Sequence, residues 1–407
     1  MTSTQAQGRF VSIDASIFDH RLCLDPYPLL EPLYQDPSIL GFHSEGMNFC
    51  IRYEDCRALI AAHQSVAREP LVTEENTARE AEYARKYPHR AWHFQHGLCD
   101  LGTKALFNRF LLEHLDAIDW SGMAPAFERL GRPGRHDDFL DDIELLPLKL
   151  MLEAWGFEAD DERVRGLHRA GVALNKSFDN FQNETLIAEG DRGLAYSDQY
   201  FFDQYHAPAA GTLLADFATQ VRQQGLDPAH AVSILVAFGN GLTNTLSIST
   251  AFALRNILRY PAAVQCLRDR PELLQRESVI LEFLRRDNHV KSLSRQVHAP
   301  FTLRGLPLEP GDALSIFYPG VNLDPTHWDR PTELDFSRAF NRDNHAIFGG
   351  SRYACIGSRL AMRYFRSILA SMLRDLPSGA RLIEEDIETD SSWLTERIIT
   401  RLPFDVP

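Results

Sequence analysis

A long, nearly uncharged stretch between two prolines constrains the fold more than any other part of the chain. Asp227-Pro228 is a typical helix start, a capping side chain followed by proline at the first helical position, and Pro261 ends the stretch. A helix over this span is about 48 Å long, enough to cross a whole domain. Because the helix is almost continuously apolar, it is expected to be buried. The sequence therefore predicts a mainly helical protein packed around one central helix.

The middle of this helix carries residues that favour neither a helix nor burial. These are glycines and polar residues: Gly239, Asn240, Gly241, Thr243, Asn244 and Thr245. One explanation is a tight helix crossing, with threonine side chains bonded back to the helix. The other is a kinked helix that passes over a cofactor and leaves room for a small ligand. The residues alone leave both explanations open.

A single cysteine lies in a glycine-rich loop directly before another predicted helix. Gly349 and Gly350 before Cys355, and Gly357 after it, leave little side-chain bulk, so a flat ligand can approach the backbone. Apolar residues then recur at helical spacing: Leu360, Ala361, Tyr364, Ile368 and Leu369. At a helix N-terminus, free N–H groups and the helix dipole stabilise a thiolate, which is a good metal ligand. A lone cysteine is nevertheless more often a small buried apolar residue.

The composition of the 407 residues fits a soluble globular protein, with 44% hydrophobic and 24% charged residues. No linker or repeat divides the chain, so we expect one domain over residues 1–407, with a small β-rich part at about 35–75 and 293–320. The net charge of −14 argues against binding to nucleic acid. The N-terminus shows no signal or membrane segment and the six cysteines show no paired spacing, which favours the cytoplasm and no membrane.

The cysteine loop resembles the haem-binding loop of the cytochrome P450 family. Phe348, Cys355 seven places later and Gly357 match that loop, in which the cysteine is the axial ligand of haem iron. The resemblance implies a mainly α fold with a small β subdomain and haem b (iron protoporphyrin IX) bound through the Cys355 thiolate. Tyr353 stands where a His or Arg usually meets a haem propionate, and the neighbouring Arg352 is a candidate for that role.

The resemblance implies further cofactor contacts outside the loop. Arg295, on a predicted strand, matches the propionate-binding arginine of the family. Lys104 falls where the family often has a His-x-x-x-Arg pair that reaches the propionates. Gly349 and Gly241 belong to the same expected cofactor surface.

The resemblance also extends to the middle of the long helix. Residues 241–245 match the family's oxygen-binding groove, where an acid and a threonine stand together. Thr245 would hydrogen-bond dioxygen there. Asn244 occupies the position of the acid, and an amide cannot shuttle a proton as a carboxyl group would.

Three charged residues are predicted to have a structural role. Glu282 and Arg285 lie three places apart on one helix, and an exposed pair of this kind contributes only about 0.3 kcal/mol. They resemble the family's Glu-x-x-Arg, whose third partner would be Arg338. A carboxylate held between two guanidinium groups can be buried, so this triad would pin the cysteine loop.

Residues of the substrate pocket are predicted from aromatic character and from the resemblance. They are Trp92, Phe94, Phe178, Leu242, Lys291, Ser292 and Trp393. The aromatic residues near Trp92, with the polar Lys291 and Ser292, suggest a compact ligand with a polar or anionic end. For Phe178, packing in the core is the commoner alternative.

The resemblance implies a haem-thiolate monooxygenase that activates O2 to hydroxylate or otherwise oxidise a small organic molecule. Arg359, Arg363 and Arg366 share one helix face, which is either an ordinary solvated face or a surface that steers an acidic ferredoxin-type electron donor. Because Asn244 replaces the acid, two alternatives stay open. One is a haem-thiolate enzyme that uses peroxide or needs no redox partner, and the other is a haem-binding protein with little turnover.

Overall fold

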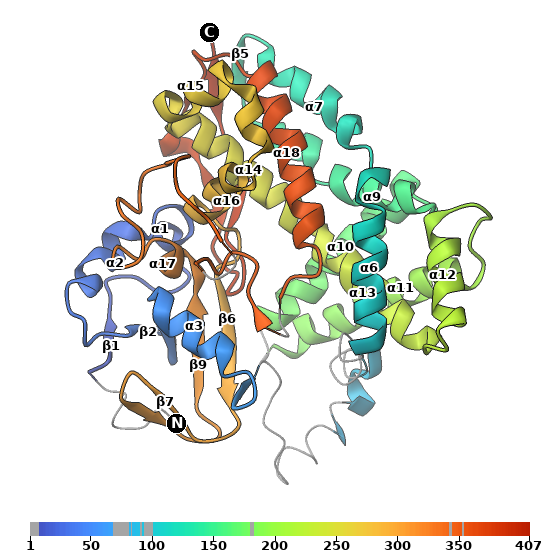
Figure 1. The fold of residues 1–407 in the computed structure, drawn as a ribbon, viewed down its shortest axis with the longest axis horizontal. Coiled ribbons are helices and arrows are strands. Elements are labelled where there is room, and N and C mark those ends of the chain that lie inside the picture. The colour runs from blue at the N-terminus through green and yellow to red at the C-terminus, as the bar shows by residue number, and fades with distance from the viewer. Residues whose placement is uncertain are drawn as a thin grey trace.

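The computed structural model describes residues 8–67, 81–82, 84–89, 92, 101–179, 183–341, 344–351 and 354–407. Helices dominate the fold, and a smaller sheet-rich part lies to one side of them (Figure 1). The longer helices are α2 (Tyr27–Tyr34), α3 (Tyr53–Ala61), α6 (Leu101–Glu113), α9 (Leu146–Trp155), α10 (Asp161–Asp179), α11 (Glu184–His206), α12 (Leu213–Gln223), α13 (Pro228–Thr243), α14 (Thr245–Arg259), α15 (Pro261–Asp269), α16 (Glu277–Arg286) and α18 (Ser358–Asp375). The short helices include α1 (His20–Leu24), α7 (Ala124–Glu128), α8 (Phe139–Ile143), α17 (Tyr318–Asn322) and the 3-10 turn η4 (Pro271–Gln275). The mainly α fold with a small β part is thus confirmed.

The largest sheet joins distant parts of the chain. Its six strands run in the order β1-β2-β3-β9-β6-β4. Their bounds are β1 (Phe10–Ser12), β2 (Gly41–Ser44), β3 (Met47–Cys50), β4 (Val66–Ala67), β6 (Ser292–Val297) and β9 (Ala313–Phe317). β3 pairs in parallel with β9, and β6 pairs antiparallel with β9, so that Arg295 lies opposite Leu314. Five of these strands fall at the two segments expected to be β-rich, about 35–75 and 293–320, whereas β1 lies outside them.

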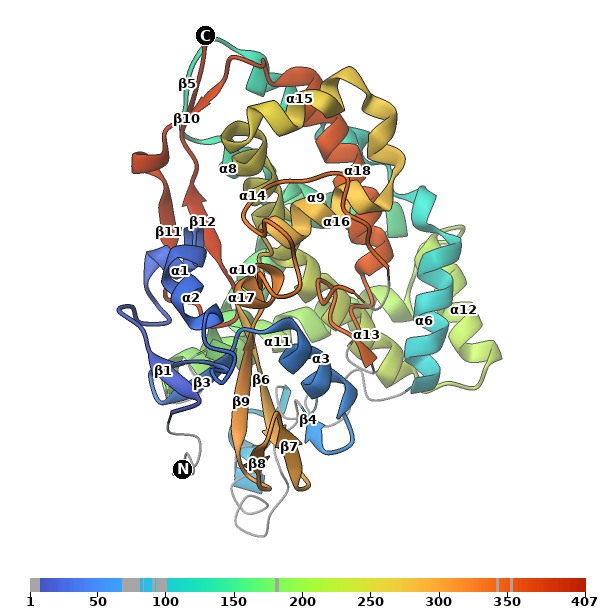
Figure 2. The same cartoon turned by 60° about the vertical axis from the view of Figure 1, so that its left-hand side comes forward.

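Short strands complete the C-terminal part. β7 (Phe301–Leu303) and β8 (Leu306–Leu308) form a hairpin, β10 (Arg381–Leu382), β13 (Phe404–Val406) and β5 (Gly134–His136) form a second sheet, and β11 (Glu388–Asp390) pairs with β12 (Ile398–Arg401). Figure 2 shows β11 and β12 beside α1. Between these two strands the chain turns inward, where Asp179 at the end of α10 accepts hydrogen bonds from the N–H groups of Leu394 (2.8 Å) and Thr395 (3.3 Å).

The predicted central helix is present, with a break at Asn244. The Asp227 carboxylate caps its start by accepting a hydrogen bond from the Ala229 N–H at 2.9 Å, and its end lies at Arg259, two residues before Pro261. By length and apolar character it is the one helix of the described residues that could cross a membrane. However, 78% of its most apolar window is buried inside the protein. It is therefore a core helix.

The neighbours of the central helix differ on the two sides of the break. Helices α6, α9, α10, α11 and α12 pack against α13, whereas α16, α18 and the C-terminal strands pack against α14. On α18 the buried face includes Leu360, Tyr364 and Ile368, as the helical spacing predicted. The Tyr364 hydroxyl lies 2.6 Å from Thr250 Oγ1 of α14. The helix that follows the cysteine loop is thus fixed directly to the central helix.

Candidate functional site

The cysteine loop closes on itself through the backbone. The N–H of Cys355 donates a hydrogen bond to the Phe348 carbonyl at 2.9 Å, and the N–H of Gly349 donates to the Ala346 carbonyl at 3.0 Å. Gly349 has a φ of +68°, and Ser351 has the same left-handed conformation at +56°. A left-handed conformation favours glycine, which stands at position 349 but not at position 351. The loop therefore presents the cysteine at a fixed point before α18.

Cys355 is accessible to solvent at the end of its loop. The residue is exposed, yet protein atoms surround the sulfur closely enough that burial raises the pKa of the thiol above its ordinary value. A backbone hydrogen bond from Gly357 and the charge of Lys104 act against this rise. We expected the helix start to favour the thiolate, and these two contributions do, but burial outweighs them. The thiol loses its proton readily only when a cation such as a metal ion approaches.

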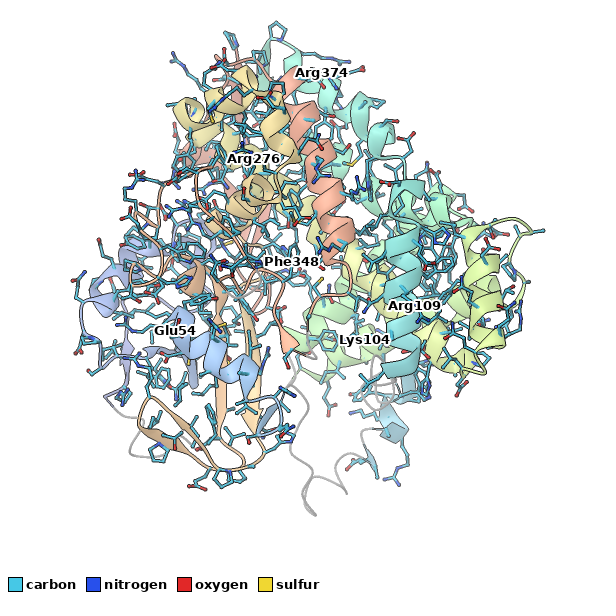
Figure 3. The ribbon with its side chains drawn as sticks, viewed as in Figure 1. Glu54, Lys104, Arg109, Arg276, Phe348 and Arg374 are labelled. Atoms are coloured by element: carbon cyan, nitrogen blue, oxygen red, sulfur yellow. The ribbon has the colours of Figure 1, made fainter. Side chains whose placement is uncertain are left out.

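Lys104 lies near both the cysteine loop and the central helix. It lies on α6, which packs against α13, and its charge reaches Cys355. Figure 3 labels Lys104 on α6 and Phe348 in the cysteine loop. The predicted cofactor residues of the loop and of α6 are thus brought together.

The break in the central helix opens onto free space. Gly241 is exposed although the residues on either side of it in α13 are buried, and a Cβ atom at this position would meet nothing within 4 Å. Thr245, one turn further, is partly exposed and donates its hydroxyl hydrogen to the Gly241 carbonyl at 2.5 Å. Gly239, by contrast, packs against Phe201, whose ring would lie 2.6 Å from an added Cβ. The glycine at 241 therefore keeps room beside the helix, whereas the glycine at 239 permits close packing.

These observations fit a flat, metal-containing group such as haem. The Cys355 sulfur is accessible to a ligand, and Gly241, without a Cβ, borders open space on a buried helix. Cationic side chains suited to carboxylate groups are present: Lys104, whose charge reaches the sulfur, and Arg295, buried on β6. Arg295 donates from Nη1 to the Ser294 carbonyl at 2.9 Å, and its charge opposes the burial that raises the pKa of Cys56 to about 12.

The predicted structural triad is assembled. Arg285 donates from Nε to Glu282 Oε2 at 2.7 Å and from Nη2 to Oε1 at 2.9 Å. Arg338 donates from Nε to Glu282 Oε1 at 3.1 Å. Glu282 and Arg285 are fully buried, so this is not the exposed pair of a solvated helix face.

The predicted pocket residues occupy different environments. Leu242 is buried on α13, Phe178 is 38% exposed on α10, and the Trp92 ring lies 6.4 Å from the ring of His230. Trp393 is buried, with its indole Nε1 donating to Asp390 Oδ2 at 2.8 Å. As residues of a substrate pocket, these four stay predictions.

Lys291 and Ser292 hold the C-terminal turn in place. Lys291 Nζ donates to the Trp393 carbonyl at 2.8 Å, and Ser292 Oγ donates to the Leu394 carbonyl at 2.7 Å. Both side chains are buried, and burial lowers the pKa of Lys291 to about 8. Their polar atoms thus serve the protein backbone, and their predicted contact with an anionic ligand gains no support. Phe94, Arg352 and Tyr353 lie outside the described residues.

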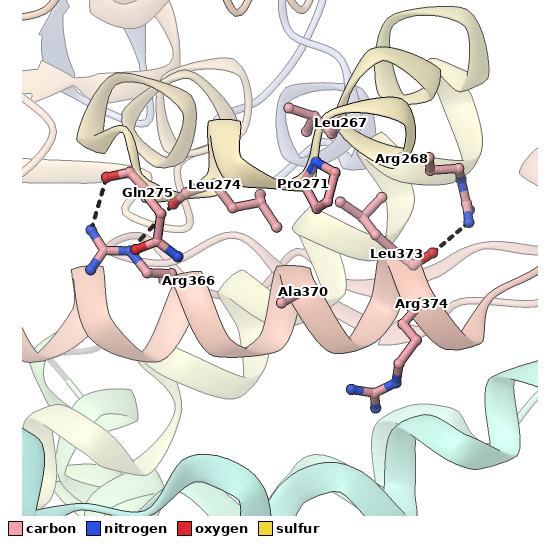
Figure 4. Close-up of a pocket in the computed structure, with 9 residues that line it drawn as sticks. All are labelled: Leu267, Arg268, Pro271, Leu274, Gln275, Arg366, Ala370, Leu373 and Arg374. Carbon is pink, nitrogen blue, oxygen red and sulfur yellow. Dashed lines mark hydrogen bonds between the residues drawn. The ribbon is translucent and has the colours of Figure 1, made fainter.

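The arginine face of α18 is largely engaged in ion pairs and hydrogen bonds. Arg359 pairs with Glu277 at 2.8 Å, and Arg363 pairs with Asp116 at 3.1 Å. Arg366 donates to the carbonyls of Leu274 and Gln275 (Figure 4). The positive charge of this face is therefore partly neutralised.

A pocket of about 380 Å³ lies along the second half of α18, between this helix, η4 and α15 (Figure 4). Ala370 on its floor is twelve residues beyond the start of α18, about 18 Å along the helix axis. This surface groove is distant from Cys355 and is not the candidate site.

Sequence reasoning missed a group of buried polar residues beside the break. Asn244 interacts through its side chain with His168 of α10 and with Glu396 of the C-terminal turn, and Asp179 lies close to Glu396. The one signal in the sequence was the amide at position 244. Nothing in the spacing shows which residues it meets.

The comparisons with known proteins agree with this geometry. The family described as Cytochrome P450 matches residues 234–377, a segment that contains the break, the Glu282 triad and Cys355. Cytochrome P450-terp of Pseudomonas sp is 26% identical over 257 residues, and this match covers 59% of the chain and 58% of that relative. Epothilone C/D epoxidase of Sorangium cellulosum is 23% identical, over 87% of the chain and 86% of the relative. The solved structure of epothilone D-bound cytochrome P450epoK superimposes with a TM-score of 0.78 at 22% identity, covering 96% of this chain and 98% of that one.

Proposed function

Because the chain belongs to the cytochrome P450 family, whose members bind haem through a cysteine thiolate, we propose that it is a haem-thiolate monooxygenase acting on a small organic molecule. The observation that carries the proposal is the position of Cys355, accessible to solvent two residues before the N-cap of α18, where the Gly357 backbone acts to lower the pKa of its thiol. A sulfur so placed can bind iron, while its amide donor moderates the charge on the thiolate.

The residues expected around the haem have distinct roles in this proposal. Cys355 would be the axial ligand, and Lys104 and Arg295 would pair with the propionate groups of the haem. Gly241 would let the porphyrin and a small ligand approach α13 closely, because no Cβ fills the space beside it. Phe348, Gly349 and Gly357 would shape the loop under the sulfur.

The bound haem would supply the activation of dioxygen and the oxidation of the substrate. The chain would supply orientation and proton handling. Since Thr245 already donates its hydroxyl hydrogen to the Gly241 carbonyl, its oxygen is available as an acceptor toward the open side of the helix. Asn244 holds the break open without carrying a titratable group of its own.

We propose a ferredoxin-type protein as the electron donor, docking on the arginine face of α18. Arg363 is 43% exposed and lies on the helix that starts at the cysteine loop. Replacing it by glutamate should slow the first electron transfer, and rising salt should slow transfer to the wild type. Arg374→Glu, at the far end of the same helix, is the matched control and should leave the rate unchanged. Equal rates for both variants would remove this docking face from the proposal.

A substrate of compact size and a cytoplasmic location belong to the same proposal. The first follows from the aromatic residues Trp92, Phe178 and Trp393, and the second from the absence of paired cysteine spacing in the sequence. Difference absorption spectra with candidate ligands would identify compounds that bind close to the haem.

The amide at position 244 favours a second candidate, a haem-thiolate enzyme that uses peroxide. Peroxide already carries both oxygen atoms in reduced form, so an enzyme that uses it depends less on proton supply during reduction of O2. Incubating the protein with substrate, ferredoxin, its reductase and NADPH, or with substrate and peroxide alone, separates the two by which mixture yields product.

The spectrum of the reduced, carbon-monoxide-treated protein tests the proposal directly. The wild type should show the Soret absorption of thiolate ligation, and Cys355→Ala should lose it. Cys266→Ala removes a cysteine on α15, away from the loop, and should keep the absorption. A wild-type spectrum without thiolate ligation, or an unchanged spectrum in the Cys355 variant, would overturn the proposed function.

A further inference from the structure

The side chain of Asn244 does not cap the helix that it precedes. It is the N-cap residue of α14, but its side chain makes no capping hydrogen bond there. Instead its backbone carbonyl accepts from Ser247 Oγ at 3.0 Å and from the Ile248 N–H at 2.9 Å. The amide is 93% buried with the rest of the residue and meets His168 and Glu396. The break therefore links two titratable side chains from distant parts of the chain.

The Asn244 amide favours the charged form of both neighbours. It lowers the pKa of Glu396 and raises the pKa of His168, in each case against the effect of burial. Only an amide offers a donor and an acceptor together, because an ionised carboxylate is an acceptor alone. An acid at position 244 would also repel Glu396.

Glu396 is a buried carboxyl with an oxygen atom that accepts no hydrogen bond among the described residues. Its relative exposure is 8%, and among the described residues no group hydrogen-bonds to Oε2. Burial and the nearby Asp179 raise its pKa to about 7, so that near neutral pH it holds a proton about half of the time. A buried carboxyl with this balance can give up a proton and regain it at working pH.

His168 lies between this buried group and a carboxylate at the surface. The residue is buried on α10, and its Nε2 lies 3.6 Å from Glu144 Oε1, whose side chain is 56% exposed. Burial lowers the pKa of His168, and Glu144 and Asn244 act against that effect. His168 Nε2 has no hydrogen-bond partner among the described residues, so His168 lies between Glu144 and the break without completing a hydrogen-bonded path.

The other titratable groups around Glu396 are engaged in pairs or hydrogen bonds, or are uncharged near neutral pH. Arg397 is paired with Asp287 at 2.9 Å, and burial lowers the pKa of His289 to about 4, so His289 is neutral. Asp179 keeps two backbone hydrogen bonds, and Lys291, with its pKa lowered to about 8, is bound to a carbonyl. Burial raises the pKa of Asp179 as well, but its Oδ2 accepts two backbone hydrogen bonds that act against this rise, whereas Glu396 Oε2 has no hydrogen-bond partner among the described residues.

We propose that Glu396, a buried carboxyl with an unpartnered oxygen beside Asn244, is the residue that holds and releases a proton at the break of the central helix. The proton leaves by breaking the O–H bond of the Glu396 carboxyl, which becomes a carboxylate favoured by the nearby Asn244 amide, and no electrons are transferred. Its use in oxidation rests on the proposed function. Its existence does not, because the proton is a property of the folded chain.

Infrared spectroscopy of the purified haem-loaded protein provides the first test. The carbonyl stretching band of a protonated, buried carboxyl should appear on acidification and disappear with a midpoint near pH 7. Glu396→Gln should lose the band. Glu385→Gln, which removes an exposed carboxyl from the same C-terminal region, should keep it. Asn244→Leu should shift the midpoint to higher pH, because the amide no longer favours the carboxylate.

Turnover and its pH dependence provide the second test. In Glu396→Gln, turnover should fall by roughly 10²-fold, the lower end of what a positioned proton donor contributes, and more of the consumed electrons should appear as peroxide. The change of turnover around pH 7 should vanish in this variant. Adding Asn244→Asp to Glu396→Gln should restore turnover and its pH dependence, because a carboxyl is then back at the break without a second one to repel it.

The two tests separate failure of this inference from failure of the proposed function. A thiolate Soret absorption together with an infrared band unaffected by Glu396→Gln would overturn the inference alone. A pH profile identical to that of the wild type in Glu396→Gln would also overturn it. If this variant does not fold, the absence of a titrating band in the wild type, or an unshifted midpoint in Asn244→Leu, has the same consequence.

Discussion

The carboxylate of Glu282 accepts a hydrogen bond from Arg338 Nε at 3.1 Å, although 56 positions separate the two residues. Arg285 completes the arrangement, and its guanidinium also donates to the carbonyls of Asn322 and Pro331 at 2.9 and 2.8 Å. One buried acid therefore fixes the segment that leads into the cysteine loop to α16. These contacts determine where the cysteine loop lies.

Removing the charge of Glu282 should unfold this region. In Glu282→Gln, two guanidinium groups lose their anionic partner, and one of them is fully buried, which costs about 3–5 kcal/mol. We expect a lower free energy of unfolding in urea and a lower haem content after expression. Glu277→Gln, which removes the exposed partner of Arg359, should change stability by less than about 1 kcal/mol. Equal losses in both variants would contradict the structural role of the triad.

Alanine substitutions at the two neighbouring glycines of α13 should have opposite effects on the protein. Gly241→Ala adds a Cβ in open space and should stabilise the helix by about 0.5–1 kcal/mol, whereas Gly241→Leu should weaken haem or substrate binding by filling the space beside α13. Gly239→Ala places a Cβ 2.6 Å from the Phe201 ring and should destabilise the protein by about 1–3 kcal/mol. Thermal unfolding and ligand titration measure both effects, and a destabilising Gly241→Ala would count against the open space.

The buried Lys291 should make stability depend on pH on the alkaline side. Its pKa is lowered from 10.5 to about 8 in the folded chain, so between these values the unfolded chain binds the proton that the folded chain has lost. The free energy of unfolding therefore gains a contribution that rises with pH over this window. The stability difference between wild type and Lys291→Met should change from pH 7 to 10. For the half-buried Lys149, whose pKa is raised by its pairing with Asp161, the difference between wild type and Lys149→Met should stay nearly flat over the same range. Parallel curves for wild type and Lys291→Met would refute this prediction.

Haem binding should release a proton from Cys355. Because burial raises the pKa of this thiol, it is protonated in the haem-free protein at neutral pH, and the ligand must be the thiolate. Haem affinity should therefore rise with pH until the thiol pKa is reached. Titrating haem-free protein at several pH values measures this dependence. An affinity of the wild type that does not vary with pH would show that the thiol is already ionised.

Sequence reasoning succeeded where local spacing carries the information. The central helix follows from Asp227-Pro228 and its apolar content, and the helix after Cys355 follows from its periodicity. The partners of Glu282 were found through the family pattern. Lys291 was expected to face a ligand, because a polar residue near a pocket looks the same in sequence whether it binds a ligand or a carbonyl. The structure turns its ammonium group to the Trp393 carbonyl.

The residues around Asn244 were beyond the reach of the sequence for a different reason. His168 and Glu396 lie on either side of it in the chain, at separations with no periodic relation to one another. Only the packing of α10 and of the C-terminal turn against the break brings them together. Likewise, the acidity of Cys355 depends on the balance between burial and two nearby groups, which no motif encodes.

The parallel pairing of β3 with β9 places Phe49 opposite Ser315 and has a consequence for biosynthesis. A ribosome emits the first of these strands long before the second, so the nascent chain must carry an unpaired apolar edge while more than half of the protein is still being made. Closing such a large loop makes sheet completion a late and slow event. A nascent polypeptide arrested before residue 313 should therefore recruit chaperones, whereas the released full-length chain should not.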